Sequence, residues 1–222
     1  MENIMAFFSS IVTMQGLVAV GVVVVLSIIL GVVGKKKSMK LTTKHVVAIG
    51  IGAAVYAATS IFSLPLAPNT SLRLAIALLT IFGALFGPVV GFLVGFIGHA
   101  LNDAMMYANV WWSWVFMSAS VGLFAGLITY SKGFDVNRGM ITKKHIALMY
   151  LYGLGGAVVG SILSYLGDVY LYGEPTEKLM LQLAVANGTN LMVVAVIGIP
   201  VVVALAKMKG KSANLEEDLD EE

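Results

Sequence analysis

Four polar side chains share one predicted helix face inside a long apolar stretch. His99, Asn102, Asp103 and Tyr107 are spaced at i, i+3, i+4 and i+8, so in a helix they project from the same side. Strongly polar groups are costly inside a membrane and usually face the protein interior or a water-filled cavity. The spacing therefore predicts a polar cluster that contacts a ligand, or a proton relay built on His99 and Asp103.

Aromatic side chains follow this cluster directly. Trp111, Trp112 and Trp114 are the three tryptophans of the chain. Tryptophan often anchors a protein at the membrane interface, but indole faces also stack on planar heterocycles in binding pockets. Because all three lie beside His99, Asn102 and Asp103, we interpret them as the wall of a pocket, with Trp111 and Trp112 as contact residues.

Amides elsewhere in the chain are further candidates. Asn187 and Asn190 lie in the last apolar segment and either form an interhelical hydrogen bond or contact the ligand; both interpretations stay open. Asn69 lies in a loop that we expect on the same side of the membrane as the three tryptophans. Arg73, which follows that loop, is interpreted as a cation that extends to the interface.

Signatures of an enzyme are absent from the sequence. It contains no nucleophile elbow, no HExxH and no phosphate-binding loop of the correct spacing, so the chain is not expected to hydrolyse ATP. Three separated histidines and no cysteine argue against a metal site or a disulfide. We predict a protein that is not an enzyme and that carries neither cofactor nor metal.

Composition places the chain in a membrane. Of its 222 residues, 59% are hydrophobic and 12% are charged, whereas a soluble domain has roughly 45–50% apolar and about 25% charged residues. This excludes a soluble enzyme, a nucleic-acid-binding protein and a disordered chain. The apolar runs are continuous rather than alternating, which favours helices over strands. We therefore predict an all-α, polytopic membrane helix bundle.

Seven stretches are long or apolar enough to be considered as spans. They are residues 15–34, 45–64, 72–87, 88–107, 111–130, 145–167 and 178–206, of which 72–87 is short. The predicted organisation is an extra N-terminal transmembrane helix with a basic linker (1–38), a six-helix bundle (39–211) and an acidic tail (212–222).

The positive charge predicts the orientation, since lysine and arginine collect in cytoplasmic loops. With these seven spans, twelve of the fourteen basic residues fall on one side, and Arg73 and Lys178 on the other. The N-terminus is then outside and the acidic tail in the cytoplasm of a cell-membrane protein. Glu2 before the first span and Lys35–Lys37 after it favour an uncleaved anchor over a signal peptide.

Small residues recur every fourth position in the span 45–64. One row is Gly50, Ala54 and Ala58, and a parallel row is Ala53 and Ala57. In lipid, small side chains let backbones approach closely. These rows either pack inside the bundle or form a smooth docking face for a partner membrane protein.

Three segments resemble a known family. HVVAIGIGAAVYAATSIF, IFGALFGPVVGFLVGFIGHALND and WWSWVF are similar to the S components of energy-coupling factor (ECF) vitamin transporters, in the branch labelled riboflavin-type. The resemblance runs from about Met39 to Lys209. The N-terminal helix and the acidic tail depart from the family's six-helix pattern, and a lysine is common in the family where Asn102 stands.

The resemblance implies that the chain captures a vitamin at the outer face. Such a subunit then joins a transmembrane coupling subunit and two ATPases, without nucleic acid. It also implies an A-x-x-x-A docking motif, which falls on Ala53–Ala57 or Ala54–Ala58. The alternatives are an S component for a different vitamin or precursor, a solitary proton-coupled permease, and a non-transporting membrane scaffold.

Overall fold

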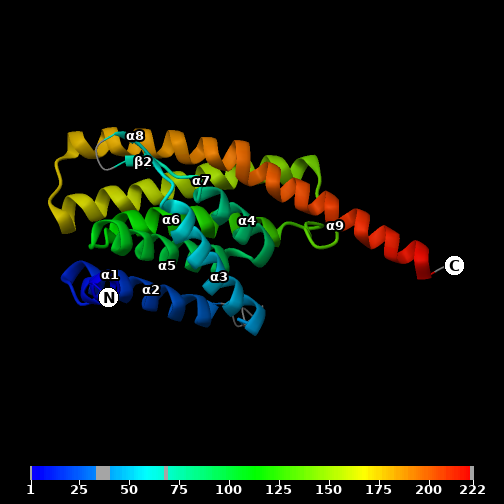
Figure 1. Ribbon diagram of the computed structural model, residues 1–222, viewed down its shortest axis with the longest axis horizontal. Coiled ribbons are helices and arrows are strands. Elements are labelled where there is room, and N and C mark those ends of the chain that lie inside the picture. The colour runs from blue at the N-terminus through cyan, green and yellow to red at the C-terminus, as the bar shows by residue number, and fades with distance from the viewer. Residues whose placement is uncertain (1, 34–40, 68–69, 221–222) are drawn as a thin grey trace.

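The computed structural model describes residues 2–33, 41–67 and 70–220 as a bundle of helices with one small hairpin (Figure 1). The longer elements are α1 (Glu2–Ile11), α2 (Met14–Val33), α3 (Thr43–Ser60), β1 (Leu64–Ala67), β2 (Thr70–Leu72), α4 (Ile76–Phe86), α5 (Pro88–Tyr107), α6 (Trp112–Gly126), α7 (Lys143–Gly167), α8 (Thr176–Val193) and α9 (Ile199–Asp220). Three short helical segments, η2 (Leu127–Tyr130), η3 (Asp168–Tyr172) and η4 (Val194–Gly198), extend α6, α7 and α8.

Each predicted span contains a helix, and the all-α polytopic membrane class is confirmed. Within the described residues, four helices are long and apolar enough to cross a membrane: Pro88–Tyr107, Trp112–Tyr130, Lys143–Tyr172 and Thr176–Lys211. The N-terminal pair, bent by 73°, makes a fifth if it is counted as one span. Helix α4 has 11 residues and reaches only about 16 Å. The count of six core spans plus one therefore stays a prediction.

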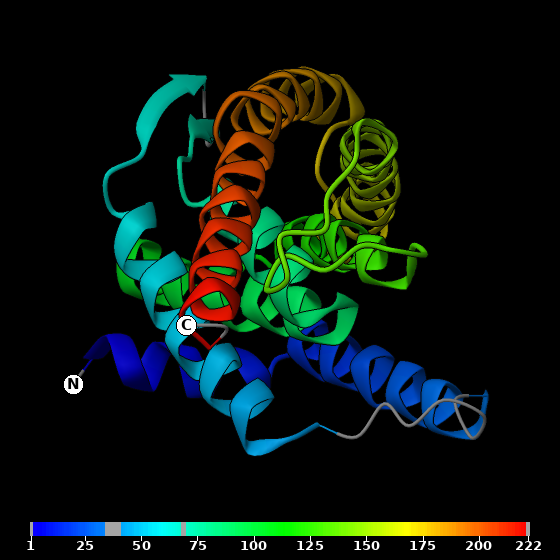
Figure 2. The same ribbon diagram turned by 90° about the vertical axis from the view of Figure 1, so that its right-hand side faces the viewer.

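One segment forms a pair of short strands, although the continuous apolar runs favour helices over strands. Strands β1 and β2 pair antiparallel, with Leu64 opposite Leu72 and Pro65 opposite Ser71. The hairpin connects α3 to α4 and flanks α8 (Figure 2). Strands of four and three residues are too short to produce a detectable alternation of apolar and polar residues.

Helices α5 and α6 pack with their backbones in direct contact. A methyl group on Gly91 would overlap the carbonyl oxygen of Gly122, and one on Gly122 would overlap that of Gly91. Gly95 likewise lies against the backbone of Ser118 and Ala119. Without side chains at these positions the two backbones approach closely and gain dispersion contacts. This contact aligns the polar residues of α5 with the start of α6.

The turn between α4 and α5 depends on one glycine. Gly87 has φ 93°, a backbone conformation that side chains rarely adopt, and Pro88 occupies the first turn of α5. Because successive helices reverse direction, the α5–α6 turn, η3 and the hairpin gather at one end of the bundle. The segment between η2 and α7 lies at the other end, from which α9 projects (Figure 1).

The N-terminal helices lie along α5 and α6 (Figure 2). Phe7, Ile11 and Ala19 join a cluster with Phe96 and Trp112. Two hydrogen bonds, described below, fasten this segment to the end of the bundle that carries η3. The extra helix of the sequence prediction is therefore packed on the bundle.

We expect Gly91→Val to destabilise the protein, because the added side chain has no space between the two backbones. Overpacking of this kind costs about 1–3 kcal/mol or more, which should lower the melting temperature of the purified protein in detergent. Gly188→Ala is the control, since nothing lies within 4 Å of the added methyl group there. A melting temperature equal to that of the wild type for Gly91→Val would contradict the close approach.

Candidate functional site

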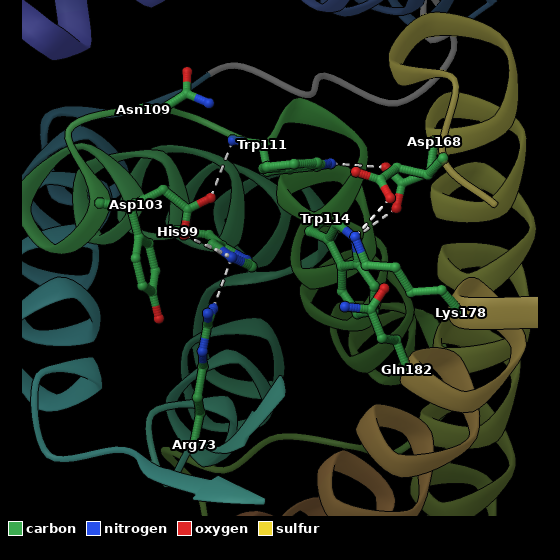
Figure 3. Close-up of a pocket in the computed structure, with 11 residues that line it drawn as sticks. Arg73, His99, Asp103, Asn109, Trp111, Trp114, Asp168, Lys178 and Gln182 are labelled. Carbon is green, nitrogen blue, oxygen red and sulfur yellow. Dashed lines mark hydrogen bonds and ion pairs between the residues drawn. The ribbon is translucent and has the colours of Figure 1, made fainter. Parts of the chain in front are cut away.

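A cavity of about 220 Å³ opens at the end of the bundle that carries η3 (Figure 3). Its walls come from the β2–α4 connection, α5, the α5–α6 turn, α6, η3 and α8. The lining residues are Arg73, His99, Asp103, Tyr107, Asn109, Trp111, Trp114, Asp168, Glu174, Lys178 and Gln182. A smaller cavity of about 30 Å³ shares Arg73, His99 and Trp114 with it and also touches Asn190.

A hydrogen-bond chain runs along one wall of the cavity. Arg73 Nη1 lies 2.6 Å from His99 Nε2, and His99 Nδ1 lies 2.6 Å from Ser118 Oγ. A guanidinium can only donate, so Nε2 must accept and the ring proton is on Nδ1, which donates to Ser118. The imidazole between Arg73 and Ser118 is therefore neutral. Tyr56 of α3 continues the chain, with its hydroxyl 3.2 Å from Ser118 Oγ.

Asp103 fixes the turn between α5 and α6. Its Oδ2 accepts from the backbone N–H of Trp111 at 3.2 Å, and its Oδ1 accepts from Asn102 Nδ2 at 3.2 Å. The same Oδ1 lies 3.3 Å from His99 Nε2. Asp103 therefore connects the polar face of α5 to the first tryptophan of the cavity wall.

Asp168 orients two of the three indoles. Its Oδ1 accepts from Trp111 Nε1 at 2.9 Å and from the hydroxyl of Ser113, and its Oδ2 accepts from Trp114 Nε1 at 2.8 Å. The residue is 1% exposed and lies in η3, a π-helical turn. Such turns insert an extra residue and redirect side chains, and they are frequent at functional sites.

Tyr172 supports the outer side of the aromatic wall. Its ring stacks on Trp111 with centroids 5.0 Å apart and an interplanar angle of 20°. Its hydroxyl accepts from the N–H of Trp112 at 3.0 Å and donates to the carbonyl of Val110. The start of α6 is thus held from η3 through both polar and stacking contacts.

Trp112 points away from the cavity. It is 3% exposed, packs on Phe96 with ring centroids 5.6 Å apart, and its Nε1 donates to the carbonyl of Ser10 in α1. A second bond to the N-terminal segment joins Gln15 Nε2 to the carbonyl of Leu171. The N-terminal helices therefore contact residues directly next to Trp111, which lines the cavity, and next to Tyr172, which stacks on Trp111.

The structure brings four of the predicted substrate-binding residues to the large cavity: His99, Asp103, Tyr107 and Trp111. Asn102 is buried behind Asp103 and does not line it. Asn190 lines the smaller cavity, whereas Asn187 Nδ2 donates to Ser161 Oγ at 2.7 Å, which is an interhelical bond.

One predicted residue, Asn69, lies outside the described residues. Within residues 2–33, 41–67 and 70–220, no group of three or more His, Cys, Asp or Glu side chains is arranged to hold a metal ion.

Several lining residues were not among the predicted contacts. From the sequence alone, Arg73 is interpreted as a cation extending to the interface, and no role is assigned to Asp168 or Glu174. Trp114 had a signal, because it lies three residues after Trp111 and thus on the same face of a helix. Arg73 and Asp168 had none, since their approach to α5 and α6 depends on the β1–β2 hairpin and on η3.

Helix α3 separates its two rows of small residues. Ala53 and Ala57 are 2% and 4% exposed and face the bundle, where Gly98 of α5 lies against the backbone of Ala53. Gly50, Ala54 and Ala58 are exposed, and nothing lies within 4 Å of a methyl group built on Gly50. Larger apolar residues, Val46, Val47, Ile51 and Val55, border this exposed row.

The fold and the cavity together describe a multi-pass membrane protein with an aromatic and polar pocket near one end of its bundle. The model of the family described as the S component of the ECF-type riboflavin transporter matches residues 40–207. A UPF0397 protein of Streptococcus gordonii is 40% identical over 179 residues, covering 80% of this chain and 95% of that protein.

The chain therefore belongs to the family of ECF-type riboflavin transporter S components, which are substrate-binding transport subunits. The sequence-based assignment to this family is confirmed. The match begins at residue 40, so α1 and α2 precede the part of the chain that the family model covers.

Single-tryptophan variants should separate the indoles of the cavity from the buried one. A protein that keeps only Trp111 or only Trp114, with phenylalanine at the other two positions, should be quenched by acrylamide, because both indoles line an open cavity. A protein that keeps only Trp112 should resist quenching, because that indole is 3% exposed. Equal Stern–Volmer constants for all three would contradict the arrangement.

Proposed function

We propose that the chain captures a vitamin-sized molecule in the cavity and delivers it through an ECF coupling subunit and two ATPases. The observation that carries this proposal is a cavity bordered by two indoles and an arginine in a chain of the S-component family. Binding sites for small molecules are concave, largely apolar or aromatic, and have a few polar groups that fix orientation. The cavity has this composition.

The contacts that we propose follow from the lining residues. Trp111 and Trp114 would stack on the ligand, Tyr107 would border it, and Arg73 would donate to one of its acceptor atoms, held in place by His99. Asp103, Asn102 and Trp112 would hold the wall in position. Asn190, beside the smaller cavity, would contact only a ligand that extends into it.

The orientation is also proposed. If the basic residues between η2 and α7 and after η4 face the cytoplasm, the cavity opens toward the outside, where an importer must meet its substrate. The N-terminus would then be outside and α9 would enter the cytoplasm. The β1–β2 hairpin, which lies beside α8, would cover part of the ligand.

The geometry disfavours the permease alternative. A proton relay requires His99 to gain and lose a proton, but its Nε2 accepts from Arg73 at 2.6 Å and its Nδ1 donates to Ser118 at 2.6 Å, so neither ring nitrogen is free to take up another proton. His99 is better suited to orient Arg73 than to carry protons.

Purification of the chain alone tests capture directly. We expect native mass spectrometry of protein from cells grown in vitamin-rich medium to show one bound small molecule, because no ATPase is needed to bind it. A flavin mass would support the family label, and a different vitamin or precursor would retain capture but replace the label. Transport by the chain alone that an uncoupler abolishes would instead support the permease.

Docking on the coupling subunit is proposed for the exposed row of α3, Gly50, Ala54 and Ala58. The row is smooth, is bordered by exposed valines and an isoleucine, and faces away from the cavity. The alternative row, Ala53 and Ala57, is already covered by the bundle, which leaves the exposed row for a partner.

We expect Ala54→Trp to abolish co-purification with the coupling subunit and its ATPases while ligand binding remains, because the indole would project from the smooth row. Leu154→Trp is the matched control, since Leu154 is a 49% exposed apolar residue on α7. Normal assembly of Ala54→Trp would refute the assignment, and loss of ligand binding in the same variant would indicate misfolding.

A further inference from the structure

The charged residues that line the cavity do not balance. With His99 neutral, three carboxylates, on Asp103, Asp168 and Glu174, stand against two cations, Arg73 and Lys178. Lys178 Nζ lies 2.6 Å from Glu174 Oε2, so these two charges form a pair. Arg73 and Asp103 both lie against the same nitrogen of His99, so these opposite charges are also close. Asp168 is the remaining charge.

Asp168 has no cationic partner within the described part of the chain. The pairs of charged groups there with nitrogen and oxygen within 4.0 Å are Arg138–Asp135 and Lys178–Glu174, and the neutral His99 lies 3.3 Å from Asp103. The donors to Asp168, namely Trp111, Trp114 and Ser113, are all neutral. A carboxylate buried to 1% exposure without a counter-charge is costly, and its field extends into the adjoining cavity, where it is weakly screened.

The two indoles that donate to Asp168 also shape the same end of the cavity. Their Nε1 atoms converge on the carboxylate from two sides, and their rings border the open space (Figure 3). Indole faces attract cations within about 6 Å of the ring. The flat aromatic walls therefore favour a planar ligand, and both the carboxylate and the ring faces favour a positive one.

We infer that the cavity selects a small planar heterocycle that carries a positive charge, with its cationic ring between Trp111 and Trp114 and directed toward Asp168. This inference rests on the proposed capture function and specifies the ligand class. The cavity, at about 220 Å³, is below the roughly 300–1,000 Å³ typical of sites for drug-sized ligands. Size and charge therefore both favour a one-ring or two-ring cation over a neutral three-ring flavin.

Arg73 does not reverse this preference. Its charge is opposed by Asp103 across the shared His99 nitrogen, so the N–H groups directed at the cavity are suited to a neutral acceptor such as a carbonyl or ring nitrogen. The ligand would thus carry its positive charge at the Asp168 end and an acceptor at the Arg73 end.

Three probes of nearly equal size isolate charge from shape: 1-methylnicotinamide, methylated on the ring nitrogen, is a cation, nicotinamide is neutral and nicotinate is an anion. Equilibrium dialysis against the full-length protein in detergent should show the cation binding at least about tenfold more tightly than either of the others. Stronger binding of nicotinamide or nicotinate, or no difference among the three, including no binding of any, would overturn the inference.

Two variants test whether the carboxylates of the cavity cause the preference for the cationic probe. Asp168→Asn should reduce the preference for the cation to near parity, and Glu174→Gln, which removes one negative charge without disturbing the bonds from the indoles, should reduce it severalfold. Glu177→Gln is the control, because Glu177 is exposed and does not line the cavity. An unchanged preference in Glu174→Gln would overturn the inference even if Asp168→Asn failed to fold.

These experiments distinguish a failure of the charge selection from a failure of the proposed capture function. A neutral or anionic molecule that co-purifies with the chain would sustain capture and overturn the charge selection. Absence of a co-purified molecule together with a strong preference for 1-methylnicotinamide would support the charge selection and weaken the proposal of tight capture.

Discussion

One buried carboxylate holds the binding end of this protein together. Asp168 accepts hydrogen bonds from Trp111, Ser113 and Trp114, so it connects η3, at the end of α7, to the start of α6. A charged acceptor strengthens each of these bonds, and a buried charge that loses its donors is heavily penalised. The two indoles are therefore fixed at their N–H edges, and their ring bodies form the wall of the cavity.

This arrangement requires α5 and α6 to be close along their length. Gly91 and Gly122 allow direct backbone contact, and the same approach brings His99 of α5 within 2.6 Å of Ser118 of α6. A larger residue at either glycine would separate the helices and stretch this hydrogen bond. The glycine contact near one end of the bundle thus determines the polar geometry nearer the other.

Hydropathy was sufficient to predict the helices, because long apolar segments have few alternatives in a membrane. It could also identify the polar face of α5, since His99, Asp103 and Tyr107 recur at helical spacing and all reach the cavity. Apart from the three-residue spacing of Trp111 and Trp114, it offered no basis for choosing among the tryptophans. Trp111 precedes α6 and Trp112 is its first residue, so their side chains point in different directions. Two residues further along α6, the Trp114 indole points toward Asp168, as the Trp111 indole does.

The contribution of Arg73 was beyond the reach of sequence reasoning for a different reason. Its position depends on a short irregular hairpin that returns the chain to α5 over a sequence separation of 26 residues from His99. Asp168 likewise depends on a π-helical turn, which has no reliable sequence pattern. Both are tertiary effects that local periodicity does not encode.

Helix α3 lies between the wall of the cavity and the exposed row of small residues. Its inner side places Tyr56 at 0% exposure, with the hydroxyl bonded to Ser118 and, through it, connected to His99 and Arg73 in the cavity wall. Its outer side carries the exposed row of small residues. Because Gly98 of α5 lies against the Cβ and ring of Tyr56, any partner that displaces α3 must either move the polar chain with it or break the bond between Tyr56 and Ser118. A single helix diameter therefore separates the exposed small-residue row from Tyr56, the α3 side chain at which the hydrogen-bond chain to Arg73 begins.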